Sequence, residues 1–156
     1  MITNLLNKNL TKIITYLTIS PGSKYTRKEL KEKTKLNNIP LDESLSKLSV
    51  LKIIKKEKNL YSLKLEYEPA NRIIEIIKSE YNKYHLSYET FIILLEIIDK
   101  LSKYNQIKDI ILFGSYRKGD DIGSSDLDIA VEIIGNSDLK IKNIGNVNLG
   151  YRKNVP

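Results

Sequence analysis

Apolar residues recur at helical spacing along the N-terminal third of the chain. The first such stretch stops at Ser20-Pro21-Gly22, where proline and glycine favour a turn. Thr26 and Glu29 have the spacing of a capping box, which predicts that a second, short helix begins there. A third helix is expected to begin near Pro40, because proline suits a first helical turn. Its buried stripe is predicted to consist of Leu41, Leu45, Leu48 and Leu51.

Two short segments after residue 51 have the pattern of strands. We expect one strand over residues 52–56 and another over residues 60–65, joined by a turn at Glu57-Lys58-Asn59. Three helices followed by a hairpin predict a winged helix-turn-helix domain over residues 1–66. Residues 26–63 also resemble the winged-helix family of archaea and bacteria, although Lys52 stands where that family commonly has glycine.

Two further helices are predicted in the middle of the chain. One begins at Pro69, and the other begins at Ser87, a good N-cap residue, and runs to about Lys103. Their apolar residues occupy more than one narrow stripe, so the helices are expected to bury more than one face, either between two modules or against another subunit. We interpret residues 67–86 as a helical linker. His85, near its end, is interpreted as a linker residue without a chemical role.

The positive charge of the chain is concentrated in its first part. The sequence carries a net charge of +7, yet residues 1–65 contain 14 basic and 5 acidic side chains, whereas residues 105–156 contain 7 of each. This asymmetry favours a polyanion as the partner of the N-terminal module. The winged-helix resemblance implies double-stranded DNA, with the third helix in the major groove. The lysines expected to contact DNA are Lys47 on that helix and Lys55, Lys56 and Lys58 on the hairpin.

Composition excludes several classes of protein. The sequence has no cysteine, which excludes disulfides and thiolate zinc sites. No apolar run approaches the roughly 20 residues that cross a bilayer. The N-terminus lacks the features of a secretory signal. These observations predict a cytoplasmic protein with no membrane partner.

A strand followed by a turn of small residues is predicted over residues 108–115. The apolar run 110–113 suits a buried strand, and Gly114 then lets the backbone approach an anion. A helix is expected to begin after Ser115, and a helix N-terminus favours negative charge. The Ser115 hydroxyl can bond a phosphate oxygen, and Lys118 is near enough to contribute positive charge. Together these features predict a phosphate-binding turn.

Two carboxylates follow on a second predicted strand. Asp126 and Asp128 are separated by one residue, and the two-residue period of a strand places both on one face. Carboxylates this close repel each other unless a cation lies between them, and Mg²⁺ prefers such oxygen ligands together with substrate phosphates. We therefore expect the turn to hold a triphosphate and the aspartates to hold the metal that bridges it.

Gly114-Ser115, followed after ten residues by Asp126-x-Asp128, resembles the motif of the minimal nucleotidyltransferases, a branch of the polymerase β-like nucleotidyltransferase superfamily. The resemblance implies a mixed sheet with flanking helices, Mg²⁺ or Mn²⁺ as cofactor and a nucleoside triphosphate, with ATP the expected one. It also implies transfer of a nucleoside monophosphate to an acceptor hydroxyl. Members of the family include antitoxins that modify a partner toxin, so a toxin is among the expected partners.

The resemblance is incomplete at a third carboxylate, which family members carry on a later strand. Asn148 stands where that acid is expected, and an amide is neither a base nor a strong ligand for a hard cation. Asp138 is the alternative third acid. The module, residues 87–156, is expected to be short at its C-terminus. It is therefore either a degenerate remnant or is covered by a partner or a second copy of the chain.

The sequence therefore predicts an α+β protein, in which a winged helix-turn-helix precedes a small nucleotidyltransferase-like α/β domain with a mixed sheet. The leading functional prediction is metal-dependent nucleotidyl transfer combined with DNA binding, as in an antitoxin. One alternative is a DNA-binding transcriptional regulator, whose second domain is inactive and binds a nucleotide or a partner. Another is a structural adaptor that binds a further protein through the middle helices. The N-terminal lysines would in that case form only the solvated face of an interaction domain.

Overall fold

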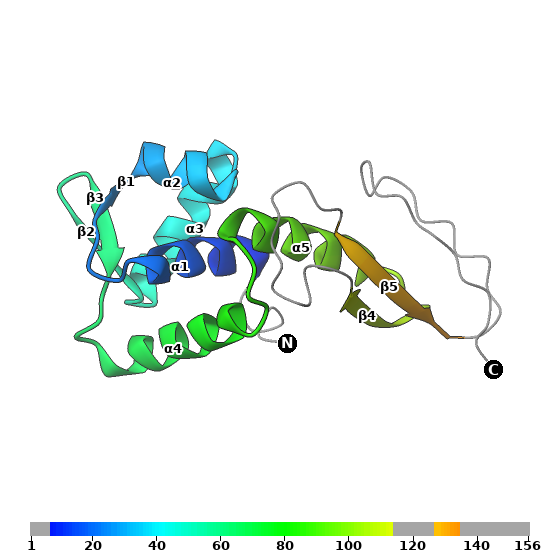
Figure 1. The fold of residues 1–156 in the computed structure, drawn as a ribbon. Coiled ribbons are helices and arrows are strands. Elements are labelled where there is room, and N and C mark those ends of the chain that lie inside the picture. Colours follow the sequence, from blue (N-terminus) through cyan, green and yellow to red (C-terminus); the bar gives the residue numbers. More distant parts are fainter. Residues whose placement is uncertain (1–6, 114–126, 135–156) are drawn as a thin grey trace.

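The computed structural model describes residues 7–113 and 127–134 (Figure 1). None of the described helices is both long and apolar enough to cross a lipid bilayer. In chain order the described elements are α1 (Lys8–Ile19), β1 (Tyr25–Thr26), α2 (Arg27–Thr34), α3 (Asn38–Val50), β2 (Ile54–Glu57), β3 (Leu60–Leu63), α4 (Glu68–Asn82), α5 (Tyr88–Leu101), β4 (Ile107–Phe113) and β5 (Asp128–Ile133).

The first two helices begin at caps that the sequence carries. In α1 the Asn7 side chain accepts a hydrogen bond from the Leu10 N–H at 3.0 Å. The predicted capping box is present at the start of α2, where the side chains of Thr26 and Glu29 each accept a hydrogen bond from the other residue's backbone N–H. This prediction is confirmed.

The third helix ends before its predicted stripe does. Leu41, Leu45 and Leu48 are buried as predicted. Leu51 follows the last residue of α3 and is 43% exposed, so its assignment to the buried stripe was wrong. Lys52 then adopts a φ of 57°, in the left-handed region, which ends the helical path of the chain. This conformation explains why glycine would suit the position.

A three-stranded antiparallel sheet with the order β1-β3-β2 packs beside these helices. Its strands β2 and β3 form the predicted hairpin, but they cover residues 54–57 and 60–63 and are therefore shorter than predicted. Glu57 pairs with Leu60, so the turn between them has two residues instead of the three expected. Lys58 occupies the left-handed region, at φ 56°, within this tight turn.

The fourth helix belongs to the same core as the first three. Pro69 lies in its first turn, and the helix begins at Glu68, directly before the predicted start. Ala70, Ile74 and Ile77 are buried and join the core formed by α1, α2, α3 and the sheet. Figure 1 shows α1 between α4 on one side and α2 and α3 on the other. We refer to residues 7–82 as the N-terminal unit.

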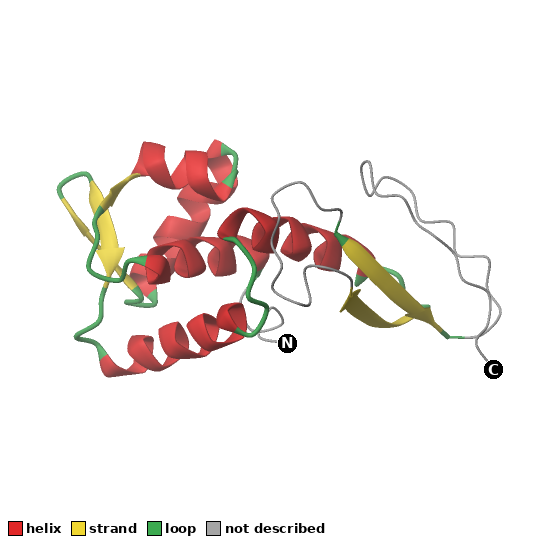
Figure 2. Ribbon diagram, viewed as in Figure 1, coloured by secondary structure: helices red, strands yellow, loops and turns green. Residues whose placement is uncertain are grey.

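The fifth helix is buried on two faces. Ser87 caps it as predicted, because its hydroxyl accepts a hydrogen bond from the Thr90 N–H at 3.2 Å. The helix ends at Leu101 rather than near Lys103. One face packs along α1, and the other packs against the hairpin of β4 and β5 (Figure 2). The expectation that this helix buries more than one face is confirmed, and both faces are covered by the same chain.

The strands β4 and β5 form a two-stranded antiparallel sheet, which lies far from the β2–β3 hairpin in Figure 1. Leu112, Leu127 and Ile129 pack against the apolar cluster around α5. Ile111 lies on the opposite face and is 48% exposed. The expectation of a fully buried strand is therefore not met at Ile111, because the described residues cover only the face of this sheet that packs on α5.

The described elements combine helices with small sheets, in agreement with the predicted α+β class. Within the described residues all strand pairs are antiparallel, so the predicted mixed sheet is not seen there. The winged helix-turn-helix assignment and the domain boundaries at residues 66 and 86 stay predictions.

Candidate functional site

The hairpin of β4 and β5 carries the described part of the predicted site. Asp128 is the first residue of β5 and lies opposite Phe113, the last residue of β4. Because Gly114 follows Phe113 directly in the chain, the predicted phosphate-binding turn starts at the end of the hairpin that carries Asp128. The predicted residues outside the described part of the chain are Gly114, Ser115, Lys118, Asp126, Asp138 and Asn148.

The side chains of β5 alternate between two faces, as predicted. Leu127 and Ile129 are partly buried against α5, whereas Asp128 and Glu132 lie on the exposed face. Glu132 accepts a hydrogen bond from the Lys108 ammonium at 2.6 Å, and this contact raises the pKa of Lys108. Asp128 forms no hydrogen bond or ion pair with another described residue. Among the described residues its carboxylate is therefore exposed and unpaired.

The donor chemistry at this end of the hairpin suits a hard cation. Mg²⁺ and Mn²⁺ bind carboxylate oxygens, and Asp128 offers one such group on an exposed strand face. Residues 7–113 and 127–134 contain no group of three Asp, Glu, His or Cys side chains that could hold a metal. Asp128 thus fits a metal as a single ligand, and further ligands would have to come from the predicted Asp126 and from substrate phosphates.

The hairpin also lies inside a segment that matches a protein-family model. Residues 96–149 match the family model Polymerase beta, Nucleotidyltransferase. The matched segment begins within α5 and includes β4, β5 and the stretch from Gly114 to Asp128. The match supports the assignment of this segment to the nucleotidyltransferase superfamily. No curated protein and no solved structure matches the chain.

Four charged residues join the start of the nucleotidyltransferase-like segment to α1. Glu96 accepts hydrogen bonds from Lys12 at 2.5 Å and from Lys8 at 2.7 Å. Asp99 accepts one from Lys8 at 3.0 Å. The Lys12 side chain is only 3% exposed, so its charge needs the nearby carboxylate. Burial alone would raise the pKa values of Glu96 and Asp99, but the lysine hydrogen bonds and charges outweigh burial and lower both.

Aromatic side chains extend this junction. Tyr88 donates a hydrogen bond to the carbonyl oxygen of Lys12 at 3.0 Å, and burial raises the pKa of Tyr88. Its ring centroid lies 5.2 Å from that of Tyr16, which lies 5.0 Å from that of Tyr25 in β1. The junction was not predicted. A signal was present, because Lys12 lies among the apolar positions of α1, where an unpaired charge would be costly.

The lysines predicted to contact DNA differ in their surroundings. Lys55 lies 3.4 Å from a carboxylate oxygen of Glu66 and 3.6 Å from one of Glu57. These two acids raise the pKa of Lys55, first through the hydrogen bond from Lys55 to Glu66. Glu57 also pairs with Lys24. Lys55 is therefore engaged within the hairpin and is a weaker candidate for phosphate contact.

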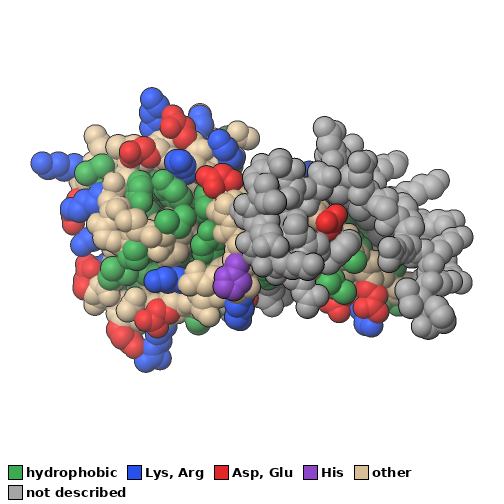
Figure 3. Space-filling model, in the orientation of Figure 1, with side chains coloured by type: hydrophobic (Ala, Val, Ile, Leu, Met, Phe, Trp, Pro, Cys, Tyr) green, Lys and Arg blue, Asp and Glu red, His purple; other side chains and the backbone are tan. Residues whose placement is uncertain are grey.

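The other three predicted lysines form no ion pair in the described part of the chain, although the charge of Lys56 helps to lower the pKa of Asp42 after the larger effect of Arg27. Lys56 lies over the Tyr61 ring, 5.4 Å from its centroid. Lys47 on α3 and Lys58 in the hairpin turn are exposed and form no ion pair there. Figure 3 shows lysine and arginine side chains spread around the outline of the N-terminal unit. The lysines of α2 and its C-cap that likewise form no ion pair with a described residue are Lys28, Lys31, Lys33 and Lys35.

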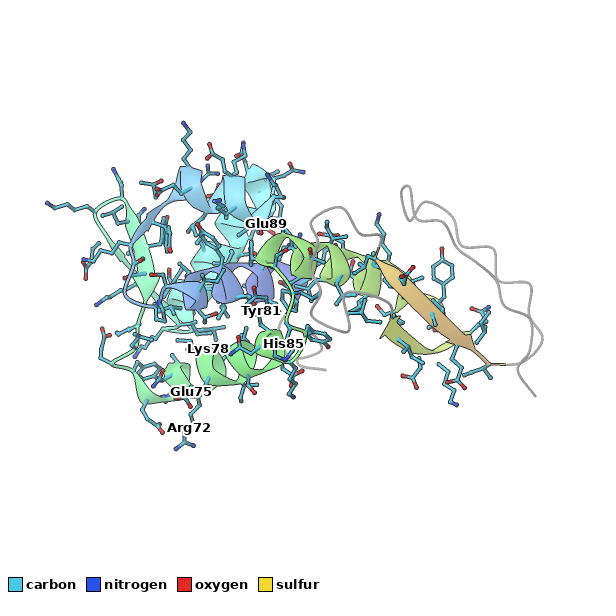
Figure 4. The ribbon with its side chains drawn as sticks, in the orientation of Figure 1. Arg72, Glu75, Lys78, Tyr81, His85 and Glu89 are labelled. Carbon is cyan, nitrogen blue, oxygen red and sulfur yellow. The ribbon has the colours of Figure 1, made fainter. Side chains whose placement is uncertain are left out.

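The outer side of α4 shows mixed charge. Arg72 pairs with Glu68 one turn earlier on the helix. Figure 4 shows Arg72, Glu75 and Lys78 along this helix and His85 at the turn that leads to α5. His85 is exposed and has a φ of 51°, and its interpretation as a linker residue stays a prediction. We assign no chemistry to this side of the described structure.

Proposed function

We propose that the protein is a metal-dependent nucleotidyltransferase that transfers a nucleoside monophosphate from a nucleoside triphosphate, with ATP the expected one, to an acceptor hydroxyl. One observation carries the proposal. Asp128 lies opposite Phe113, so the exposed carboxylate and the start of Gly114-Ser115 occur at the same end of one hairpin. This hairpin lies within the segment that matches the nucleotidyltransferase family model.

Each predicted site residue has a role in this proposal. Gly114 and Ser115 would bind the triphosphate through backbone N–H groups and a hydroxyl, and Lys118 would add positive charge. Asp126 and Asp128 would hold Mg²⁺ or Mn²⁺. The metal, when bound, would neutralise charge on the phosphates that react. Because Asn148 stands at the expected position of a third acid, the acceptor hydroxyl would have to lose its proton without a carboxylate there.

Titration calorimetry tests the proposal without knowledge of the acceptor. ATP with Mg²⁺ should bind the wild-type chain, and binding should be lost in an Asp126→Asn, Asp128→Asn variant. Glu132→Gln is the matched control, because Glu132 lies on the same face of β5 but is already paired with Lys108. Metal-dependent binding that persists in the double variant, or that is lost equally in the control, would contradict the assignment of the aspartates.

We propose double-stranded DNA as a second ligand of the same protein. The specific observation in favour is that α2, a turn of residues 35–37 and α3 precede the β2–β3 hairpin, an order that resembles a winged helix-turn-helix. The unpaired lysines on α2, α3 and the hairpin turn supply the positive charge that phosphates require. A regulator whose nucleotidyltransferase segment is inactive would keep this ligand. The antitoxin role, the toxin partner, self-association and the cytoplasmic location are further proposals from the sequence.

Salt-dependent binding of the full chain to duplex DNA tests the second ligand. Lys47→Gln and Lys58→Gln should each weaken binding and reduce the slope of log affinity against log salt by about 1. Lys55→Gln is the matched control and should change the slope less, because Lys55 already pairs with two acids. No measurable binding at low salt would rule out this function.

A further inference from the structure

The exposed face of the β4–β5 hairpin carries two carboxylates that lie opposite each other. Asp109 in β4 pairs with Glu132 in β5, and both residues are exposed. Like charges directly opposite in an antiparallel sheet are unfavourable. Lys108 donates a hydrogen bond to Glu132 at 2.6 Å, whereas Asp109 forms no hydrogen bond or ion pair with a described residue. One lysine therefore lies beside two carboxylates, and that of Asp109 has no cation in contact with it among the described residues.

An apolar row lies between these carboxylates and Asp128. Ile111 in β4 pairs with Ala130 in β5, and both residues lie on the exposed face. Because a strand rises about 3.3 Å per residue, this row lies about 7 Å from Asp128, and the row of Asp109 lies about 13 Å from it. The face therefore presents, in this order, the predicted metal ligand, an apolar row and an unpaired carboxylate.

The length and charge of this face favour a polypeptide as its occupant. Ile134 directly follows β5, continues the same alternation and is 61% exposed, so the face extends about 20 Å from Asp128. An extended polypeptide has the two-residue period of a strand, so its alternate side chains match successive rows of the face. Nucleic acid is disfavoured, because its phosphates would meet the carboxylates of Asp109 and Glu132 with like charge. A positively charged side chain, in contrast, would relieve the repulsion between these two acids.

We propose that the acceptor is a basic polypeptide segment that lies extended over this face, with its hydroxyl residue beside Asp128, an apolar residue on Ile111 and a lysine or arginine at Asp109. This inference rests on the proposed nucleotidyltransferase function. Side chains that face the hairpin are two positions apart, so the basic residue is expected four positions from the hydroxyl residue. In the transfer, the acceptor oxygen bonds to the α-phosphorus of ATP and the bond from that phosphorus to the bridging oxygen of the β-phosphate breaks. Pyrophosphate leaves, and the hydroxyl proton passes to water.

Synthetic peptides of one length test this pattern with the full chain, Mg²⁺ and ATP labelled at the α-phosphate. Each peptide would carry serine, threonine or tyrosine as the acceptor, leucine two positions away and lysine four positions away, in both chain directions. One matched set would have glutamate in place of the lysine, and another would have the lysine three positions away. The peptides with lysine four positions away should accept the label about fivefold faster than either matched set, the effect expected for one exposed ion pair.

Variants of the protein assign each contact to its side chain. Asp109→Asn should remove the preference for lysine over glutamate, and Asp109→Lys should reverse it, because the attraction changes sign. Ile111→Ala should slow labelling of the leucine peptides about fivefold, because apolar contact area is lost. Glu75→Gln is the control and should change neither rate nor preference, since Glu75 is an exposed acid on α4 without an ion pair to a described residue. The substituted positions are exposed, so the variants should keep the thermal stability of the wild type.

The possible failures separate the inference from the function on which it rests. If ATP with Mg²⁺ binds but no peptide is labelled, or the lysine and glutamate peptides are labelled equally, the nucleotide site stands and the acceptor is wrong. The same holds if RNA or ethanolamine accepts the label and the peptides do not. If ATP does not bind, the proposed function is refuted and the inference with it. If Ile111→Ala lowers the molecular mass in light scattering, another copy of the chain covers the face, and this also overturns the inference.

Discussion

The N-terminal unit and the β4–β5 hairpin bury their isoleucines to different degrees. Ile13 and Ile14 of α1 have no exposed surface, because α2, α3, α4 and the sheet surround that helix. Ile129 in the hairpin is only partly buried, and Ile111 lies on an exposed face. The exposed carboxylate of Asp128 lies in the less buried region. The best-packed part of the molecule and the candidate site are therefore in different regions, as is common where a rigid core carries a more exposed site.

The largest expected effect on stability is the replacement of a core isoleucine by alanine, and the same replacement in the hairpin serves as the comparison. Ile14→Ala should lower the free energy of unfolding by about 2–5 kcal/mol, because it creates a cavity in a packed core. Ile129→Ala should lower it by only about 1 kcal/mol, because that side chain is partly exposed and leaves a smaller cavity. Urea unfolding measured by circular dichroism compares the two. Equal losses would contradict the difference in packing.

An intermediate effect is expected at the junction between the two regions. Glu96→Gln keeps the shape of the side chain but weakens the partner of the buried Lys12. The loss of stability should be about 1–2 kcal/mol, less than for a fully buried pair because the Glu96 side chain is 38% exposed. Glu80→Gln, which affects a surface pair with Lys83, is the control and should cost less than about 0.5 kcal/mol.

The same variant has an expected pH signature. The pKa of Glu96 is lowered in the folded protein, so its contribution to stability is present above the unfolded pKa of about 4.3 and is lost as the pH falls through the folded value. The difference in stability between wild type and Glu96→Gln should therefore narrow as the pH falls below about 4. If the difference stays constant down to about pH 3, the carboxylate does not stabilise the junction by its charge.

The smallest expected effect lies within the core itself. The Thr15 hydroxyl is fully buried and has no hydrogen-bond partner in the described structure. Thr15→Val should raise the free energy of unfolding by about 1 kcal/mol, because an unsatisfied polar group is removed. Thr18→Val is the matched control and should be destabilising, since the Thr18 hydroxyl donates to the Thr15 carbonyl at 2.7 Å. Thermal unfolding would show shifts of opposite sign, and a destabilised Thr15→Val would mean that the hydroxyl is satisfied.

Features that depend on a few neighbouring residues could be predicted from the sequence. The capping box of Thr26 and Glu29 and the cap at Ser87 were identified because a cap involves residues three positions apart. The two-residue period of a strand likewise placed Asp128 and Ile129 on opposite faces of β5. These signals act within one element, so they require no knowledge of its neighbours.

Features that depend on tertiary contacts could not be predicted in this way. The burial of Ile74 and Ile77 in the core of the N-terminal unit was not predicted for the helical linker of residues 67–86, because an amphipathic pattern does not identify the surface it meets. The partner of Lys12 is Glu96, 84 positions away in the sequence. Leu51 was assigned to a buried stripe because its spacing continues that of α3, and spacing alone does not show where a helix ends.

The helix α5 limits how the protein could be divided or recombined. A fragment that stops before α5 would leave the Lys12 ammonium without Glu96 and the Lys12 carbonyl without the Tyr88 hydroxyl that donates to it. A fragment that starts after α5 would leave the apolar side chains of Leu112 and Ile129 without the cluster they cover. A chimera that exchanges the N-terminal unit between proteins of this architecture would therefore fold only if α1 and α5 came from the same parent protein.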